Sequence, residues 1–258
     1  MPEREDKPGD ESTDGYDPDV TVSRADIELG EASEADFAAA DTAPVADESE
    51  RELLDRLDAE AATERQRAVL ALSERDPGED ALAALSDIAR DDPDALVRQF
   101  AVEALGNVAG PTPEAVLSAC DDADPWVRAE AIVALDHLDR EGHVERIEAA
   151  LEDDHHAIRR NAVIALWKGR GEDALPALLA LADDESDRVR EWVAELLGRI
   201  DHPDAERALI DLQDDTESIV AKTAAHALDS TDSATVASGQ TRSGGTDPRG
   251  AGDQPPQL

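Results

Sequence analysis

The sequence contains few aromatic residues and a single cysteine. Trp, Tyr and Phe together make up 2% of its 258 residues, so any core must be built from Ala, Leu, Val and Ile. Small aliphatic residues rich in Ala favour closely packed helices over a sheet. Because Cys120 is the only cysteine, an intramolecular disulfide and a multi-cysteine zinc site are both excluded.

Positive charge is also scarce. The chain has 24 Lys and Arg against 63 Asp and Glu, a formal net charge of −39. No basic stripe is present that could replace the counterions of a nucleic acid, so we expect no nucleic-acid partner. The excess of Asp and Glu could bind a basic partner. Alternatively, it could adapt the protein to a high-salt cytoplasm, where salt screens the repulsion between the acidic side chains. Its spread along the whole chain favours the second interpretation and indicates a halophilic archaeon.

Long apolar runs are missing. The longest, ALPALLALA at 174–182, is too short to span a bilayer. The first ten residues, MPEREDKPGD, are charged throughout and do not form a signal peptide. We therefore expect a cytoplasmic protein with no membrane association.

Composition divides the chain into three parts. Residues 1–48 are rich in Asp, Glu, Ser, Gly and Pro and poor in large apolar residues, so ordering them would cost more entropy than burial returns. Residues 230–258 are of low complexity. We expect both to be disordered tails flanking a helical domain at 49–229.

Within that domain one segment recurs. DDPDALVRQFAVEALG at 91–106 returns as DDADPWVRAEAIVALD at 121–136. Apolar residues stand one before an anchor position and three, six and seven after it, which is the period of an amphipathic helix. Six copies can be aligned, with steps of 30 to 33 residues between their anchors: Arg65, Arg98, Arg128, Arg159, Arg190 and Ala221.

Each copy is expected to form helix B of a helix-turn-helix unit, following a helix A such as GEDALAALSDIAR at 78–90. Asp94 and Asp124 stand at N-cap positions of B helices, and Gly106, Gly169 and Gly198 mark their ends. One such hairpin cannot bury both apolar faces, whereas stacked hairpins share a continuous core. The fold class is therefore all-α, an α-solenoid of about six repeats.

An aspartate stands six residues before the anchor in five copies. This Asp-x5-Arg pairing, the V-R-x-x-A-x-x-A-L string and the repeat length resemble HEAT repeats, most closely the HEAT-like repeats of phycobilisome (PBS) lyases. The resemblance covers about residues 50–229. It implies that the Asp and Arg side chains hydrogen-bond along the stack as a structural ladder made of Asp92, Arg98, Asp122, Arg128, Asp153, Arg159, Asp184 and Arg190.

Enzyme signatures are weak. The chain has no phosphate-binding Gly loop, no G-x-S-x-G and no H-E-x-x-H. The resemblance also extends to enzymes, namely PBS lyases and the iron-binding deoxyhypusine hydroxylases, so an activity on a protein or a tetrapyrrole is the alternative function. The missing His-Glu dipeptides argue against it. We predict no catalytic residue, cofactor or metal site, and we interpret His155 and His156 as solvated turn residues and Cys120 as a core residue.

The informative residues are those that depart from the repeat. Val133 and Ile164 stand five residues past their anchors, on the side opposite the buried stripe, where another copy has Glu103. We therefore expect both to be exposed and adjacent. Trp167 follows Ile164 by one turn, and Trp192 occupies a flanking position near the same surface.

B helices line the concave side of HEAT arrays, and an exposed apolar patch there indicates binding. Alternatively, the two tryptophans fold onto the ridge between helices. We predict a non-enzymatic scaffold or adaptor, a monomer or weak homo-oligomer, that binds a protein or peptide on its concave B-helix face. Its anchors are Val133, Ile164, Trp167 and Trp192, and its acidic rim is Glu103, Glu191 and Glu195.

Overall fold

A computed structural model describes residues 42–108 and 110–240, and within them the only regular elements are helices. The A helices are α2 (Glu50–Arg56), α4 (Glu79–Asp91), α6 (Glu114–Ala119), α8 (Val144–Ala149), α10 (Leu175–Ala180) and α12 (Pro203–Leu212). The B helices are α3 (Ala62–Ser73), α5 (Ala95–Gly106), α7 (Pro125–Asp139), α9 (His156–Arg170), α11 (Asp187–Leu197) and α13 (Ser218–Gln240). Short 3-10 turns precede or join them: η2 (Ala43–Val45), η3 (Ala150–Glu152) and η4 (Gly171–Ala174).

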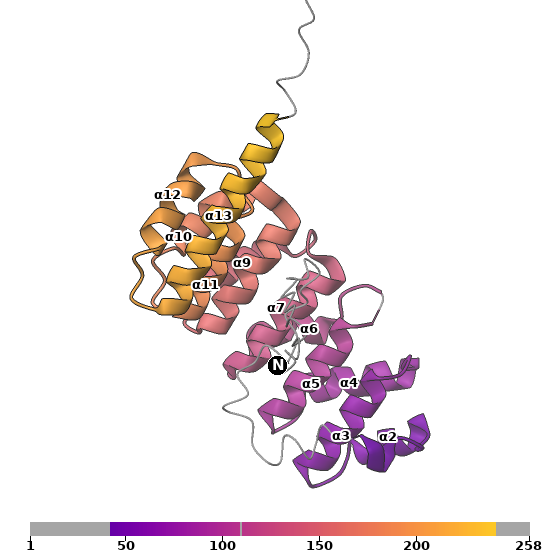
Figure 1. The fold of residues 1–258 in the computed structure, drawn as a ribbon. Coiled ribbons are helices and arrows are strands. Elements are labelled where there is room, and N and C mark those ends of the chain that lie inside the picture. Colours follow the sequence, from indigo (N-terminus) through magenta and orange to yellow (C-terminus); the bar gives the residue numbers. More distant parts are fainter. Residues whose placement is uncertain (1–41, 109, 241–258) are drawn as a thin grey trace, which may run out of the picture.

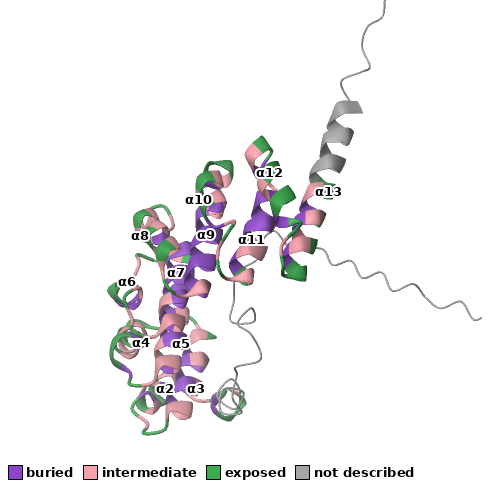
Figure 2. Ribbon diagram, turned by 90° about the vertical axis from the view of Figure 1, so that its left-hand side faces the viewer, coloured by how far each residue is buried: buried purple, intermediate pink, exposed green. Residues whose placement is uncertain are grey.

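The helices form two layers. In Figure 2 the A helices from α4 to α12 lie along one side and the B helices from α5 to α13 along the other. Each B helix packs against the next B helix along the chain, so the array runs from α2 and α3 at one end to α13 at the other (Figure 1). The predicted α-solenoid is therefore confirmed. We call the side of the B layer that is turned away from the A helices the B face.

The core is aliphatic, as the composition predicts. One hydrophobic cluster runs from Val45 to Leu166 and a second from Val133 to Ala227, so the two overlap on α7 and α9. Phe100 is the only aromatic side chain among the buried residues of the described part. Small side chains let the B helices approach each other closely, and the two clusters adjoin on α7 and α9, where Leu151 packs against both.

Two glycines mark the closest of these approaches. A Cβ atom added to Gly106 would lie 2.7 Å from the Cβ of Ala134 on α7, and one added to Gly198 would lie 2.5 Å from the Cβ of Ala227 on α13. Gly198 has φ −61°, an ordinary right-handed helical value. These glycines therefore leave room for the neighbouring helix, and they do not form a left-handed helix cap.

The helical array differs from the predicted domain at both ends. Val45, inside the predicted N-terminal tail, is 1% exposed and joins the core. Helix α13 continues past residue 229 to Gln240. The rest of the two predicted tails, residues 1–41 and 241–258, lies outside the described residues. None of the described helices is long and apolar enough to cross a bilayer.

Candidate functional site

An ion-pair ladder runs along the stack at the N-terminal ends of the B helices. Nε and Nη2 of Arg98 donate to the two carboxylate oxygens of Asp122 over 2.8 and 2.7 Å, the two-point geometry in which a guanidinium binds a carboxylate most strongly. The same fork joins four other pairs at 2.7–3.1 Å: Arg65–Asp92, Arg128–Asp153, Arg159–Asp184 and Arg190–Asp215.

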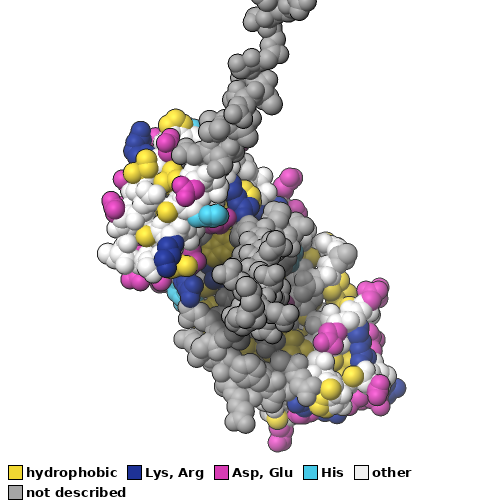
Figure 3. Space-filling model, in the orientation of Figure 1, with side chains coloured by type: hydrophobic (Ala, Val, Ile, Leu, Met, Phe, Trp, Pro, Cys, Tyr) yellow, Lys and Arg dark blue, Asp and Glu magenta, His cyan; other side chains and the backbone are white. Residues whose placement is uncertain are grey.

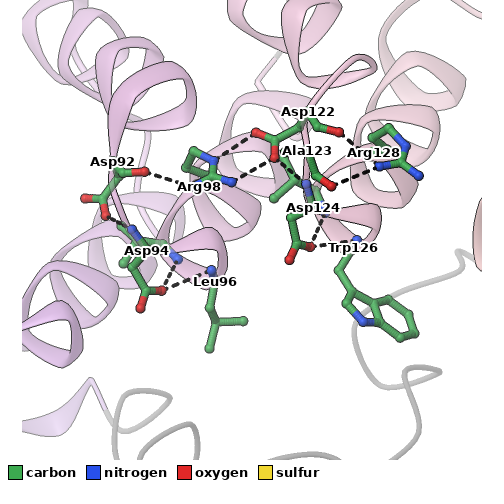
Figure 4. A network of polar contacts seen from close by, with 11 residues as sticks. Asp92, Asp94, Leu96, Arg98, Asp122, Ala123, Asp124, Trp126 and Arg128 are labelled. Carbon is green, nitrogen blue, oxygen red and sulfur yellow. Dashed lines mark hydrogen bonds and ion pairs between the residues drawn. The ribbon is translucent and has the colours of Figure 1, made fainter.

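Each arginine also holds the turn of its own repeat. Nη1 of Arg98 donates to the carbonyl oxygen of Asp92, 2.9 Å away, and the Asp122 carboxylate accepts from the backbone N–H of Asp124 over 2.8 Å. Figure 4 shows Arg98 lying between the two aspartates, with Arg128 continuing the row. One arginine side chain therefore holds the turn before its own B helix and the turn before the B helix of the next repeat.

Hydrogen bonds favour the ionised form of three ladder carboxylates, those of Asp122, Asp153 and Asp184. Burial alone would raise the pKa of Asp122, but hydrogen bonds from Arg98 and from the backbone outweigh it, and the pKa lies below its ordinary value. The balance is the same for Asp153 and Asp184. In the Arg159–Asp184 pair the side chains are only 9% and 5% exposed. Such a pair depends on both partners, because removal of one leaves a buried charge unpaired.

The B face corrects one expectation from the sequence. Val133 and Ile164 are 9% and 4% exposed in the complete chain, so the prediction that they are exposed is wrong. Both belong to the second hydrophobic cluster, together with Val163, Leu178 and Val193. Because α7 and α9 pack side by side, branched side chains at this helix position join the core instead of projecting into solvent.

Trp167 and Trp192 lie beside the same cluster. Both are half-buried and pack against it from α9 and α11. The guanidinium carbon of Arg199 lies 5.1 Å from the centre of the Trp167 ring, within cation–π distance. Arg199 in turn pairs with Glu195 over 3.1 Å. Trp167, Arg199 and Glu195 thus link α9 to α11.

The structure brings together only part of the predicted acidic rim. Glu191 and Glu195 are both on α11, and Glu191 pairs with Arg188 at 3.5 Å. Glu103 lies on α5, which α7 and α9 separate from α11. Lys168 of α9 pairs with Asp136 of α7 over 3.0 Å. This part of the B face therefore carries acidic, basic and aromatic groups side by side.

Sequence reasoning missed a ring cluster at the edge of the B layer. Trp126 meets the ring of His155 edge-on with the centroids 4.9 Å apart, and His155 stacks on His156 at 4.6 Å. The Nδ1 atoms of both histidines are buried and have no hydrogen-bond partner within residues 42–108 and 110–240. The two histidines are therefore half-buried packing residues, not the solvated turn residues expected from their acidic neighbours.

Cys120 lines a cavity of about 430 Å³ between the two layers, together with Arg128 and Arg146. Burial raises the pKa of its thiol, and Arg146 offsets this only in part, so the thiol is not activated. Among residues 42–108 and 110–240, no group of three or more His, Cys, Asp or Glu side chains is arranged to hold a metal ion.

Comparison with known proteins agrees with this architecture. The HEAT repeats family matches residues 50–136, 113–196 and 180–239. Among curated proteins, none matches the sequence significantly.

Solved structures resemble the chain at low sequence identity. YibA of Escherichia coli is 19% identical over 80% of each chain, with a TM-score of 0.61. A designed armadillo repeat protein is 20% identical over 71% of this chain and 100% of its own, with a TM-score of 0.46. Human deoxyhypusine hydroxylase in complex with glycerol is 22% identical over 79% of this chain and 82% of its own, with a TM-score of 0.40. At these identities the likeness concerns the fold alone. The family match spans most of the sequence and fits the observed helix pairs and ladder, so the chain belongs to the HEAT repeats family.

Proposed function

We propose that the protein is a non-enzymatic scaffold that binds a protein or an extended peptide on its B face. Trp167 and Trp192 are the anchors. Val133 and Ile164 form the apolar floor beneath them, and Glu191 and Glu195 form the nearby rim. Glu103 belongs to a separate, more distant part of the same face.

One observation supports this proposal above the others. Two of the three tryptophans of the chain depart from the repeat pattern on adjacent B helices and stay half-buried around one hydrophobic cluster. A half-buried indole has apolar area left to cover, and tryptophan is enriched among the residues that dominate binding energy. Arg199 and Glu195 add polar groups that can orient a partner.

The test is affinity capture from an extract of the native host, with the wild type and a Trp167→Ala/Trp192→Ala variant as baits. Loss of two anchors should weaken capture by at least about 30-fold, which corresponds to about 2 kcal/mol. Ile210→Ala is the matched control, because Ile210 is 50% exposed but lies on α12 of the A layer. Equal capture by all three baits, with unchanged helical circular dichroism, would refute the proposal.

We further propose that the repeats are of the PBS-lyase HEAT-like type and that the protein is cytoplasmic, monomeric or weakly associating, in a halophilic archaeon. The acidic side chains support the habitat, since they are scattered over the visible surface in Figure 3 and not gathered in one patch. Their repulsion is screened by salt. The melting temperature should therefore rise between 0.1 M and 3 M KCl, and a constant or falling value would contradict a halophilic origin.

A further inference from the structure

We propose that the joint between the third and fourth repeats is a pH-sensitive hinge, which the ring cluster of Trp126, His155 and His156 closes and which protonation of the two histidines opens. The joint lies between α7 and α9. The inference goes beyond the proposed function, because it concerns the shape of the array and holds whether or not the B face binds a partner.

The first argument is the ion pair of the ladder at this joint. Arg128 and Asp153 pair over 3.0 and 3.1 Å, whereas the other four pairs of the ladder span 2.7–2.9 Å. Both side chains are 20% exposed, more than those of the other four pairs. On the A side of the joint, Arg146 of α8 forms an exposed pair with Asp121. Solvated ion pairs contribute little to stability, so this joint depends on other contacts.

The second argument is a cavity directly behind the ion pair. The cavity of about 430 Å³ that Cys120 lines is also lined by Arg128 and Asp153, by Ile132 of α7 and by Ile158 of α9. Side chains that face an unfilled space lose the dispersion contacts that neighbouring atoms would supply. The two repeats are therefore incompletely packed behind the ladder at this joint.

The third argument is that the ring cluster spans the joint at its ladder edge. Trp126 belongs to α7, whereas His155 is the N-cap of α9 and His156 is its first residue. The centroid of the Trp126 ring lies 4.9 Å from that of His155 and 6.4 Å from that of His156. Edge-on ring contacts at such distances are favourable. The ring cluster therefore supplies a contact that the weak ion pair and the cavity leave this joint in need of.

Protonation is incompatible with the position of these rings. The Nδ1 atoms of His155 and His156 are buried and have no hydrogen-bond partner within the described part of the chain. A neutral imidazole tolerates this, because its proton can reside on Nε2 and leave Nδ1 as a bare acceptor. A second proton would place a positive charge and an N–H donor on a buried atom without an acceptor, which is costly. To be protonated, the rings must turn into solvent and leave Trp126.

The charged groups around His155 do not remove this cost. Arg128 faces it from α7, and Arg159 and His156 face it from α9. All three oppose a further positive charge. Asp153 favours the charge, but its carboxylate already accepts hydrogen bonds from Arg128 and from the backbone N–H of His155. Burial, the largest influence, therefore keeps the pKa of His155 below its ordinary value.

Loss of the ring cluster leaves the joint attached mainly on its other side. There α7 and α9 still pack against each other, and Val133 shares a hydrophobic cluster with Val163 and Ile164. The array from α2 to α7 can then tilt against the array from α9 to α13 about this contact, and the ladder edge widens. Acid would thereby change the shape of the array without separating its helices.

Distance measurements by electron paramagnetic resonance on the full chain test the hinge. In a Cys120→Ser background, nitroxides are attached at Ala83→Cys on α4 and Glu145→Cys on α8, two exposed positions on opposite sides of the joint. The control pair is Glu145→Cys with Glu206→Cys on α12, which lies on one side of it. Each pair spans two helix steps, about 16–20 Å. Between about pH 7.5 and about pH 5.5, the range in which histidine titrates, the first distance should lengthen and its distribution broaden. The control distance should stay constant.

A second variant assigns the change to the ring cluster. His155→Phe/His156→Phe keeps two rings against Trp126 but cannot take up a proton, so the first distance should no longer depend on pH. A lengthening that persists in this variant would come from another titrating group, such as His137 of α7, and overturns the proposal. An unchanged distance in the chain with both histidines also overturns it. So does an equal change in both label pairs, which would mean a general loosening of the array.

The ring protons of His155 provide a measurement without any change in the ring cluster. Their nuclear magnetic resonance signals, assigned with His155→Gln, should titrate with the same midpoint as the distance change, below about 6.5. A distance change centred near pH 4, where carboxylates titrate, contradicts the hinge. If His155 titrates while the distance stays constant, the ring turns out without opening the joint, and the proposal is wrong.

Discussion

The ladder edge and the B face belong to the same six helices, yet they differ in how strictly they repeat. At the ladder edge five Arg–Asp forks recur with nearly the same geometry. On the B face the position five residues past the anchor is Glu103, Val133, Ile164, Glu195 and His226 in successive copies. Every joint needs the same fork to stack, whereas a binding surface has no reason to be periodic. The difference separates residues that build the array from residues that distinguish its parts.

Removing one Arg–Asp pair of the ladder should have the largest effect on the free energy of unfolding. In Arg159→Ala the Asp184 carboxylate, whose side chain is 5% exposed, loses its guanidinium, and unfolding should become easier by about 3 kcal/mol. The control is Arg90→Ala, which removes the more exposed pair with Asp87 and should cost less than about 1 kcal/mol. Urea unfolding followed by circular dichroism measures both. Similar losses in the two variants would show that the ladder contributes no more than a surface pair.

Adding a methyl group where two B helices approach most closely should have an intermediate effect on stability. Gly198→Ala places a methyl group 2.5 Å from the Cβ of Ala227, and such overpacking costs about 1–3 kcal/mol. Ser73→Ala at the equivalent position of α3 serves as the control, since it removes atoms and adds none. Thermal unfolding distinguishes them. An unchanged or higher melting temperature for Gly198→Ala would mean that the B helices can move apart freely.

Acid should act at different pH on two sets of groups at the ladder edge, first on the histidines of the ring cluster and then on the ladder aspartates, and the first step should have the smallest effect on stability. Burial lowers the pKa of His155, with His156 adding to it, so the folded state disfavours a proton that the unfolded chain takes up near its ordinary pKa of about 6.5. Stability should therefore fall as the pH drops through that value. Asp122, Asp153, Asp184 and Asp215 have lowered pKa values, so their contribution is present above about pH 4 and is lost below it.

A His155→Gln variant tests this assignment. Denaturant midpoints measured from pH 8 to pH 3 should show a smaller upper step and an unchanged lower one, because His137, whose pKa is also lowered by burial, still contributes to the upper step. If the upper step keeps its full size after the substitution, the ring cluster does not contribute to it.

The sequence predicts the repeat well because every repeat packs against its neighbours in the same way, and so needs the same residue types at the same positions. Asp92 and Arg98 identify members of two successive rungs. Ala101, Ala104 and Leu105 identify the core side of a B helix. The B face is harder to predict because a single helix wheel ignores the neighbouring helix. A helix wheel places Val133 and Ile164 opposite the buried stripe, yet both are buried in the array. Gly106 and Gly198 resemble helix caps, and only the distance to the next helix reveals their role. The edge-on contact of Trp126 with His155 joins residues from two repeats, so no local pattern could indicate it.

Each ladder arginine pairs with an aspartate of the next repeat, and this has an evolutionary consequence. Every fork crosses a single joint, from the B helix of one repeat to the turn before the next. A gene that duplicates or deletes one whole unit of about 30 residues would keep every remaining fork in register, because the new junction restores the arginine-to-aspartate match. Arrays of this kind can lengthen or shorten by whole units while each B helix changes its outer residues independently.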